Sequence, residues 1–203
     1  MIKFVYFDVG GVLLAFYHTL TILPKRWGID PEAYRAFMKS VERARSSGAM
    51  TEADVERELV TRFGAKIPQN YWASGQFVEL FEPIVEMHTL VHQLQSRYRL
   101  GLLTNVTETV WLRGQQEFAH LYPNAPFEQI VASYAVHCAK PDRRIYEIAI
   151  ERTGLQPAEI CFIDDMPENL AVARTFGMQT IQSYPAEIHR TIAEAHRLLL
   201  ATE

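Results

Sequence analysis

Carboxylates follow two apolar stretches of the sequence that read as buried strands. Asp8 comes directly after residues 2–7, and the pair Asp164-Asp165 follows residues 160–163. The carboxyl ends of parallel strands meet at one edge of a sheet, so we expect these carboxylates to lie close together. Clustered carboxylates repel one another unless a cation is present, and their hard oxygens suit Mg²⁺. The sequence therefore predicts a magnesium site at this edge.

Two other stretches bring polar residues to the same expected edge. A predicted strand over residues 98–103 is followed by Thr104-Asn105, and Lys140 precedes Pro141 in a loop that leads into a helix. Taken singly, Thr104 or Asn105 is typical of a helix cap and Lys140 of a solvated surface charge. Their shared position beside the acidic residues indicates a common pocket.

The turn after Asp8 contains Gly10 and Gly11. Two consecutive glycines permit positive φ angles and a close approach of the backbone to a bound group. A competing interpretation is that Asp8 only caps a turn or a helix. The turn alone does not decide between the two.

The pattern of apolar residues predicts an α/β protein with a helical insertion. From Pro83 onward helices alternate with short apolar strands, which is typical of a Rossmann-like, doubly wound parallel sheet. Residues 16–82 instead show helical periodicity throughout. We therefore predict a core of residues 1–15 plus 83–203 and an inserted all-helical cap domain of residues 16–82.

Several helix boundaries are marked in the sequence. Asp30 is placed to cap a helix that begins at Pro31, and Thr51 with Asp54 resembles a capping box. Pro141 and Pro167 are each expected to start a helix. A final helix is expected over residues 186–200.

Composition excludes several classes of partner. The 203 residues carry a formal net charge of -4, and no dense stripe of Lys and Arg predicts a nucleic-acid or membrane surface. Arg43 and Arg45 beside Glu42 read as a solvated helix face. Cys138 and Cys161 fit no metal-binding spacing and are expected to be reduced thiols. With no leader-like or membrane-spanning segment in the sequence, we expect a cytoplasmic protein, and its oligomeric state is not indicated.

Four stretches in order then indicate a family. Residues 7–13 (FDVGGVL), 103–105 (LTN), 140–141 (KP) and 162–165 (FIDD) resemble the four motifs of the haloacid dehalogenase superfamily, whose members are mostly phosphatases. The resemblance covers residues 1–15 and 83–183, and the helical insertion matches the cap position of the sugar-phosphatase-like branch. The opening motif is similar to that of α-D-glucose-1-phosphate phosphatases and of phosphatase domains fused to epoxide hydrolases.

The resemblance implies a role for each motif residue. It implies that Asp8 is the nucleophile, that Lys140 offsets the charge of nucleophile and phosphate, and that Thr104 and the Asn105 backbone bind phosphoryl oxygens. It also implies that Mg²⁺ is held by Asp8, the backbone carbonyl of Gly10, Asp165 and Asp164. Asn169 would orient the acidic pair. The expected function is Mg²⁺-dependent hydrolysis of a small phosphorylated metabolite, with sugar phosphates among the candidates.

One position departs from the family pattern. Most phosphatases of this superfamily carry a second Asp two residues after the nucleophile as general acid and base, and here that position is Gly10. General acid-base catalysis contributes about 10²- to 10⁴-fold to rate. We therefore expect a slower phosphatase that favours good leaving groups, or one that uses water or His18 for proton transfer.

Two alternatives remain at this point. In the dehalogenase branch the aspartate attacks carbon, but those enzymes resemble this chain less, since they carry an arginine soon after the nucleophile and lack the acidic pair. Residues 11–24 contain no arginine, and Asp164-Asp165 is present. The second alternative is a protein that binds phosphate and metal without turnover, because Gly10 removes the usual acid. The sequence does not identify the substrate.

Overall fold

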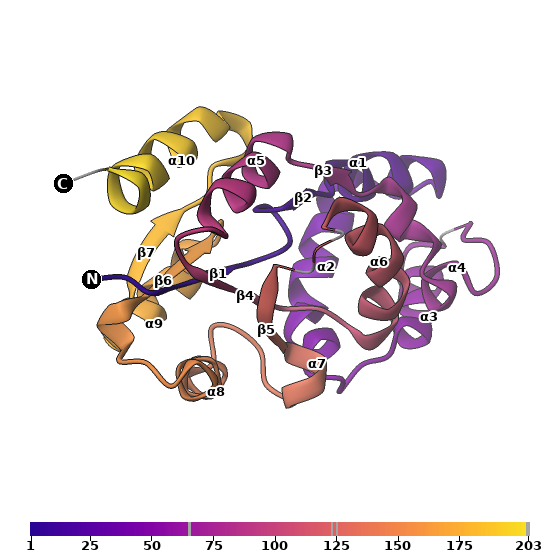
Figure 1. Ribbon diagram of the computed structural model, residues 1–203. Coiled ribbons are helices and arrows are strands. Elements are labelled where there is room, and N and C mark those ends of the chain that lie inside the picture. The colour runs from indigo at the N-terminus through magenta and orange to yellow at the C-terminus, as the bar shows by residue number, and fades with distance from the viewer. Residues whose placement is uncertain (65, 123, 125, 202–203) are drawn as a thin grey trace.

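The computed structural model describes residues 1–64, 66–122, 124 and 126–201. Within these residues five parallel strands form one sheet in the order β5-β4-β1-β6-β7 (Figure 1). The strands are β1 (Phe4–Phe7), β4 (Arg99–Thr104), β5 (Phe127–Ala132), β6 (Ile160–Asp164) and β7 (Gln179–Gln182). Helical crossovers join these strands, so the predicted Rossmann-like α/β fold is confirmed.

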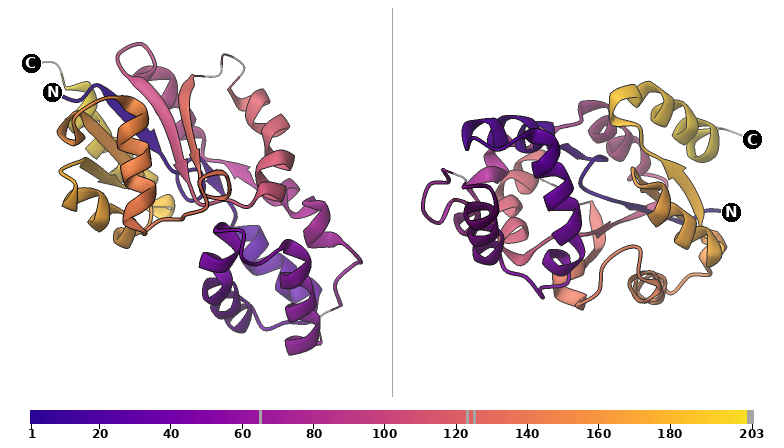
Figure 2. Two further views of the ribbon diagram at one scale, coloured as in Figure 1. Left: turned by 90° about the horizontal axis from the view of Figure 1, so that it is seen from below. Right: turned by 180° about the vertical axis from the view of Figure 1, so that it is seen from behind.

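Helices cover both faces of the sheet (Figures 1 and 2). One face packs against α5 (Val85–Leu94) and α10 (Ile188–Ala195), and the other against α8 (Arg143–Thr153) and α9 (Pro167–Thr175). Side chains of β1 alternate between the two layers: Val5 and Phe7 join the first, Phe4 and Tyr6 the second. All four are fully buried, as expected for a central parallel strand.

The segment between β1 and α5 is mainly helical. It contains α1 (Tyr17–Arg26), α2 (Pro31–Ser46), α3 (Glu52–Phe63), α4 (Tyr71–Ser74) and a 3₁₀ turn, Gln76–Leu80. These elements share a core of their own around Trp27, Tyr34 and Leu59, and they lie together beside the sheet (Figure 2, left). Two short antiparallel strands that the sequence did not predict, β2 (Leu14–Ala15) and β3 (Glu82–Pro83), pair where the chain leaves and re-enters the core. The division into a cap of residues 16–82 and a core stays a prediction.

The helix caps agree with the sequence signals. The Asp30 carboxylate accepts hydrogen bonds from the backbone N–H groups of Glu32 and Ala33, at 3.1 and 2.9 Å. Thr51 and Asp54 form the predicted capping box at the start of α3. Each cap satisfies N–H groups that have no partner within the helix.

The lead-in to α8 differs from the prediction. The helix begins at Arg143, after Asp142, and not at Pro141. A short helix, α7 (Ser133–Val136), separates β5 from Lys140, so Lys140 lies in a loop between two helices and not at a strand end. The peptide bond between Lys140 and Pro141 is cis.

The C-terminal helix is less regular than predicted. A 3₁₀ turn, Pro185–Glu187, precedes α10, and a π-helical segment, His196–Leu200, follows it. Ala195 and Leu199 are buried against the sheet. Cys138 and Cys161 are free thiols, as predicted. In the described part of the chain no helix has the length and apolar character that crossing a bilayer requires.

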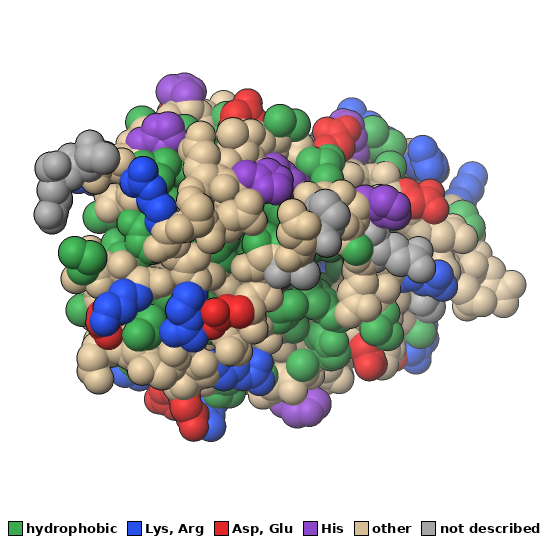
Figure 3. Space-filling view, viewed as in Figure 1, with side chains coloured by type: hydrophobic (Ala, Val, Ile, Leu, Met, Phe, Trp, Pro, Cys, Tyr) green, Lys and Arg blue, Asp and Glu red, His purple; other side chains and the backbone are tan. Residues whose placement is uncertain are grey.

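Helix α6 (Glu108–Leu121) lies beside β5 at the edge of the sheet (Figure 1). None of its described side chains is fully buried, although Val110, Trp111 and Phe118 are apolar. Hydrophobic side chains gather on the surface over β5 and α6 (Figure 3). The packing of this helix is therefore looser than that of α5 or α8.

Candidate active site

Neighbouring strands bring three of the predicted residues to one edge of the sheet. Thr104 is the last residue of β4, Asp8 follows β1, and Asp164 is the last residue of β6. The backbone N–H of Asp8 donates to the carbonyl of Ile163 at 2.9 Å, which fixes β1 against β6 up to the site. The predicted convergence of strand ends therefore occurs at β4, β1 and β6.

The carboxylates form a compact cluster. Asp8, Asp164 and Asp165 each offer an oxygen, and these oxygens all lie within 4.8 Å of one another. Burial, together with the neighbouring carboxylates, raises the pKa of Asp8 to about 6 and that of Asp165 to about 7, although Lys140 lowers both. Negative charge at this density favours a bound cation.

Lys140 supplies a buried positive charge beside the cluster. Its Nζ lies 3.0 Å from Asp8 Oδ2 and 2.5 Å from Asp164 Oδ2, and its side chain is fully buried. Burial alone would lower the lysine pKa, but the attraction of Asp164 and Asp8 outweighs it and raises the pKa. Lys140 is therefore protonated at neutral pH and can offset negative charge on Asp8 and on a bound anion.

Asn105 holds the loop that carries Lys140. Its side-chain Nδ2 donates to the carbonyl of Lys140 at 2.9 Å, and its Oδ1 accepts from the backbone N–H of Lys140 at 2.8 Å. The side chain of Asn105 is thus occupied in positioning the lysine. Sequence reasoning missed this contact because it joins residues 35 positions apart through backbone groups.

Asp164 is held by hydrogen bonds on both oxygens. Its Oδ1 accepts from the backbone N–H of Met166 at 2.8 Å and from Asn169 Nδ2 at 3.0 Å. Its Oδ2 accepts from Lys140 and from Asn169. Asn169 therefore orients Asp164, while no hydrogen bond from another described residue reaches the carboxylate of Asp165.

These donors fit a magnesium ion. Asp8 and Asp165 present hard carboxylate oxygens next to the Gly10-Gly11 backbone, which is the donor chemistry that Mg²⁺ prefers. A β-carbon at Gly11 would lie 2.4 Å from Asp165 Oδ2, and Gly11 has φ of +69°. Glycine at this position therefore leaves the space that the Asp165 carboxylate fills.

We predict that magnesium raises the melting temperature more at pH 8 than at pH 5. The folded-state pKa values of Asp8 and Asp165, about 6 and 7, exceed the ordinary value of 3.8. Between about pH 4 and pH 7 the folded protein therefore binds more protons than the unfolded chain. Without metal, its free energy of unfolding falls as pH rises through this range. Above it the deprotonated carboxylates bind metal without competition from protons.

The measurement is thermal unfolding with Mg²⁺ and with EDTA at both pH values. Asp165→Asn is the control, because it removes one donor and should reduce the shift at pH 8. Equal shifts at pH 5 and pH 8 in the unaltered protein would contradict the prediction.

Phe16 lies where a side chain at position 10 would extend. A β-carbon at Gly10 would be 2.4 Å from Cε1 of the Phe16 ring and 2.9 Å from Cζ. The ring also packs against Phe81, with centroids 5.9 Å apart. The position of the family's usual general acid is therefore bordered by an aromatic wall.

A cavity of about 520 Å³ lies over the cluster, between the sheet edge and the helical segment. On the side of the sheet it is lined by Asp8, Lys140 and Asp165. On the side of the helical segment it is lined by Arg35 and Lys39 of α2. Its location allows a substrate to contact the carboxylates and the helical segment together. We call it the catalytic cavity.

Arg45, which also lines this cavity, corrects one prediction. The sequence suggested a solvated side chain, but that of Arg45 is 14% exposed and pairs with buried Glu52 at 3.0 Å. Thr107, which caps the start of α6, donates its hydroxyl to Glu52 Oε1 at 2.6 Å. The pair therefore links α2 and α3 to the loop that follows Thr104-Asn105.

His18 lies apart from the carboxylates. Its Nδ1 is 3.0 Å from Glu82 Oε1, and both side chains are largely exposed. It is absent from the described residues that line the catalytic cavity. The geometry therefore does not support the predicted use of His18 for proton transfer.

Comparison with known proteins agrees with the fold and identifies the family. The family of haloacid dehalogenase-like hydrolases matches residues 28–183, which is more than half of the chain. The chain belongs to this family. The predicted membership in the haloacid dehalogenase superfamily is thereby confirmed.

Solved structures of other family members share its fold. A haloacid dehalogenase family enzyme from Bacteroides thetaiotaomicron, in complex with magnesium and inorganic phosphate, has a TM-score of 0.70 at 22% identity, covering 92% of this chain and 96% of that one. A predicted family hydrolase from Porphyromonas gingivalis has a TM-score of 0.70 at 25% identity, with full coverage of both chains. L-2-haloacid dehalogenase from Xanthobacter autotrophicus, with chloropropionic acid covalently bound, has a TM-score of 0.72 at 18% identity, covering 100% and 85%.

Curated relatives within the family are longer proteins. Acyl-CoA dehydrogenase family member 10 of Mus musculus is 28% identical over 88% of this chain, and bifunctional epoxide hydrolase 2 of Sus scrofa is 26% identical over 62%. The alignments span only 17% and 23% of those proteins. (S)-2-haloacid dehalogenase 4A of Burkholderia cepacia is 42% identical over 43 residues, or 21% of this chain and 19% of that protein.

Proposed function

We propose that this hydrolase cleaves a phosphate monoester of a small metabolite, with Mg²⁺ as cofactor and Asp8 as nucleophile. The observation that supports this most directly is the cluster of Asp8, Asp164 and Asp165 with Lys140 between two of its members. Displacement of a halide from the carbon of a haloacid does not require the two adjacent carboxylates of Asp164 and Asp165. They suit a reaction in which a metal ion and a phosphate dianion share the site.

The reaction follows from the positions of these groups. An Asp8 oxygen forms a bond to phosphorus while the bond between phosphorus and the substrate oxygen breaks, which gives an aspartyl-phosphate and an alcohol or phenol. The Lys140 ammonium, 3.0 Å from Asp8, offsets the charge that builds on the phosphoryl oxygens. Water then attacks phosphorus and releases phosphate and free Asp8. Bound Mg²⁺ would supply further charge neutralisation on the phosphoryl oxygens.

In this proposal the N-terminus of α6 and the residues just before it bind the phosphoryl group. Thr104 ends β4, and Asn105 begins the loop that leads to the Thr107 cap of this helix. The free N–H groups and the dipole at a helix N-terminus favour an anion. The helical segment of residues 16–82 would act as the cap that encloses the rest of the substrate, and a sugar phosphate remains one candidate.

The first test is hydrolysis of p-nitrophenyl phosphate with Mg²⁺. We expect turnover that EDTA abolishes and that added Mg²⁺ restores. The dehalogenase alternative, in which Asp8 attacks carbon, predicts chloride release from 2-chloropropionate that EDTA does not affect. A protein that only binds metal and phosphate would show a Mg²⁺-dependent thermal shift with phosphate but no turnover of either substrate.

Gly10 and Phe16 give a prediction about the leaving group. We expect the double variant Gly10→Asp with Phe16→Ala to hydrolyse an alkyl phosphate, such as glycerol 1-phosphate, at least about tenfold faster than the unaltered protein, because it adds a general acid where the ring stood. Poor leaving groups gain most from protonation. The rate with p-nitrophenyl phosphate, whose leaving group needs little protonation, should change less.

Two single variants separate the causes. Gly10→Asp alone should gain little, because the Phe16 ring lies 2.4 Å from the β-carbon position. Phe16→Ala alone should also gain little, because it supplies no acid. The prediction is wrong if either single variant matches the double variant, or if the double variant gains nothing with the alkyl phosphate.

A further inference from the structure

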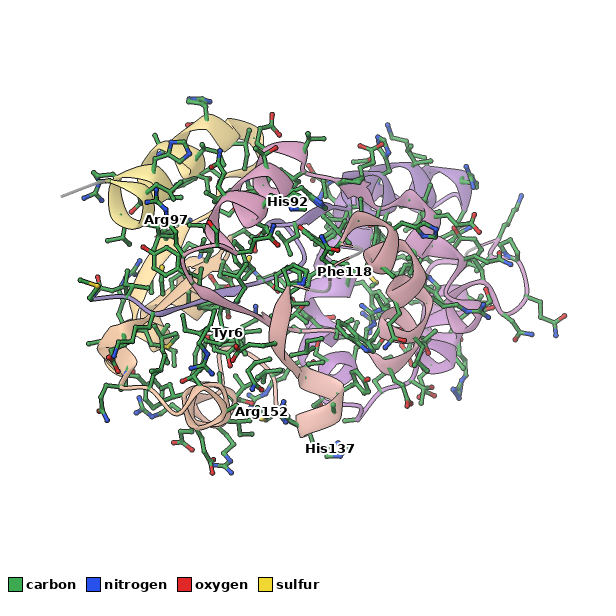
Figure 4. The ribbon with its side chains drawn as sticks, viewed as in Figure 1. Tyr6, His92, Arg97, Phe118, His137 and Arg152 are labelled. Atoms are coloured by element: carbon green, nitrogen blue, oxygen red, sulfur yellow. The ribbon has the colours of Figure 1, made fainter. Side chains whose placement is uncertain are left out.

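A second cavity, of about 400 Å³, lies between α6 and the edge of the sheet formed by β4 and β5. Its walls include Trp111 and Phe118 of α6 and Phe127 of β5, and Figure 4 places Phe118 between these elements. None of the described residues that line this cavity carries a charge. We call it the apolar cavity, and its volume is within the range of sites for small organic molecules.

The apolar cavity adjoins the catalytic cavity. The two share lining residues, namely Gly10, Phe16, Phe81, Asn105, Val106 and Val110. The shared wall therefore contains the position of the missing acid and the aromatic ring that borders it. In this family's pattern that acid serves the leaving group, so the apolar cavity begins beside the place where the leaving group stands.

Tyr122 contributes to the wall of the apolar cavity. Tyr122, which caps the C-terminus of α6, is 3% exposed and lines the cavity. Among the described residues its hydroxyl has no hydrogen-bond partner, and a buried hydroxyl without a partner costs about 1–3 kcal/mol. Burial raises the pKa of Tyr122, so the hydroxyl stays protonated. The hydroxyl oxygen itself is buried, so Tyr122 adds no polar group to the wall of the cavity.

The chemistry at position 10 selects the same kind of molecule. With Gly10 in place of an acid, the substrate oxygen must leave without a strong proton donor, which favours a phenolic oxygen over an alkyl alcohol. Phenols are also flat and apolar, as the walls formed by Phe16, Phe81 and Trp111 require. The missing acid at position 10 and the apolar cavity are thus two independent observations, and both favour an aryl ester as substrate.

We infer that the preferred substrates are aryl phosphate monoesters whose ring system enters the apolar cavity. This inference rests on the proposed phosphatase function. An Asp8 oxygen bonds to phosphorus, the bond from phosphorus to the aryl oxygen breaks, and the aryloxide leaves with the electron pair and takes a proton from water. Water then hydrolyses the aspartyl-phosphate.

The test compares substrates that differ in ring size. 2-Naphthyl phosphate and phenyl phosphate have similar leaving groups, and we expect the naphthyl ester to have about tenfold or higher kcat/KM, because its second ring adds buried apolar surface. α-D-Glucose 1-phosphate should be a poorer substrate than either. Equal kcat/KM for the two aryl esters, or a preference for the sugar phosphate, would overturn the inference.

Two variants on α6 test the location. Gly114 lines the apolar cavity and a β-carbon there would meet no atom within 4 Å, so the side chain of Gly114→Phe begins in open space beside the cavity. We expect it to reduce the ratio of kcat/KM for naphthyl to phenyl phosphate to about one. Leu112→Phe is the matched control, because Leu112 is 57% exposed on the same helix and should leave the ratio unchanged. An unchanged ratio in Gly114→Phe would place the ring elsewhere and overturn the inference.

Binding of 2-naphthol separates this inference from the proposed function. We expect the fluorescence of 2-naphthol to change on binding to the unaltered protein and the Leu112→Phe variant, with about tenfold weaker binding to Gly114→Phe. If these results hold but no phosphate ester turns over, the proposed function is wrong. If esters turn over but 2-naphthol does not bind, the apolar cavity is not the site.

Discussion

We expect replacement of Asp8 by asparagine to lower kcat for p-nitrophenyl phosphate by about 10³-fold or more, because an amide cannot form the covalent intermediate. The variant should remain folded. Lys140 keeps its contact with Asp164 at 2.5 Å, so the substitution leaves no unpaired buried ammonium. The variant also loses a carboxylate whose pKa burial has raised, which removes a cost of charge burial above pH 6.

Asp142→Asn is the control for this experiment. Asp142 also pairs with a cation, Arg43, at 2.9 Å, but its side chain is 39% exposed and its carboxylate is not part of the cluster. Its loss should change kcat less than about twofold, in line with the small contribution of exposed ion pairs. An Asp8→Asn variant that keeps more than a tenth of the activity would rule out Asp8 as nucleophile.

Removal of the Lys140 charge should affect both activity and stability. We expect Lys140→Met to lower kcat by about 10²- to 10³-fold, because the phosphoryl group loses a preorganised cation. In the absence of metal we also expect a loss of about 3–5 kcal/mol in the free energy of unfolding, because Asp8 and Asp164 are left without their buried partner. Urea denaturation with EDTA measures the second effect.

Lys3→Met provides a matched comparison. The Nζ of Lys3 lies 2.5 Å from Glu159 Oε1, the same separation as between Lys140 and Asp164, but the Lys3 side chain is 57% exposed. Its loss should cost less than about 1 kcal/mol because water screens the pair. Similar losses in the two variants would show that burial does not set the strength of the Lys140 contacts.

Some features of this molecule could be predicted from short stretches of sequence. The strands that end at Asp8 and Asp164 are apolar runs, and the caps at Asp30 and Thr51 depend on residues only two or three positions away. Local patterns of this kind report local structure. The closeness of Asp8 to Asp164 could also be predicted, because the order of a parallel sheet places strand ends together.

Other features depend on contacts between distant segments and could not be predicted. The hydrogen bonds from Asn105 to Lys140, the contact of Phe16 with Gly10, and the pairing of Arg45 with Glu52 follow from how loops and helices pack. Arg45 illustrates the limit, since its charged neighbours suggested a solvated face. The sequence could not show that α3 places a buried carboxylate against it.

The apolar cavity belongs to the same group of features. The sequence predicts a helix over about residues 108–120, and α6 is observed over Glu108–Leu121. Its distance from the sheet, and therefore the space lined by Phe118 and Phe127, depends on the packing of side chains on both elements. The presence of a helix can be predicted from periodicity, but the volume that it leaves uncovered cannot.

The most direct test of the proposed function is identification of the covalent intermediate. The protein is mixed with Mg²⁺ and p-nitrophenyl phosphate, quenched in acid within the first turnover, digested, and analysed by mass spectrometry. A second sample contains 2-chloropropionate in place of the phosphate ester. The account predicts a phosphoryl group on the peptide that contains Asp8 in the first sample and no adduct in the second. A carboxyethyl ester on Asp8 in the second sample, or a phosphoryl group on another residue, would contradict it.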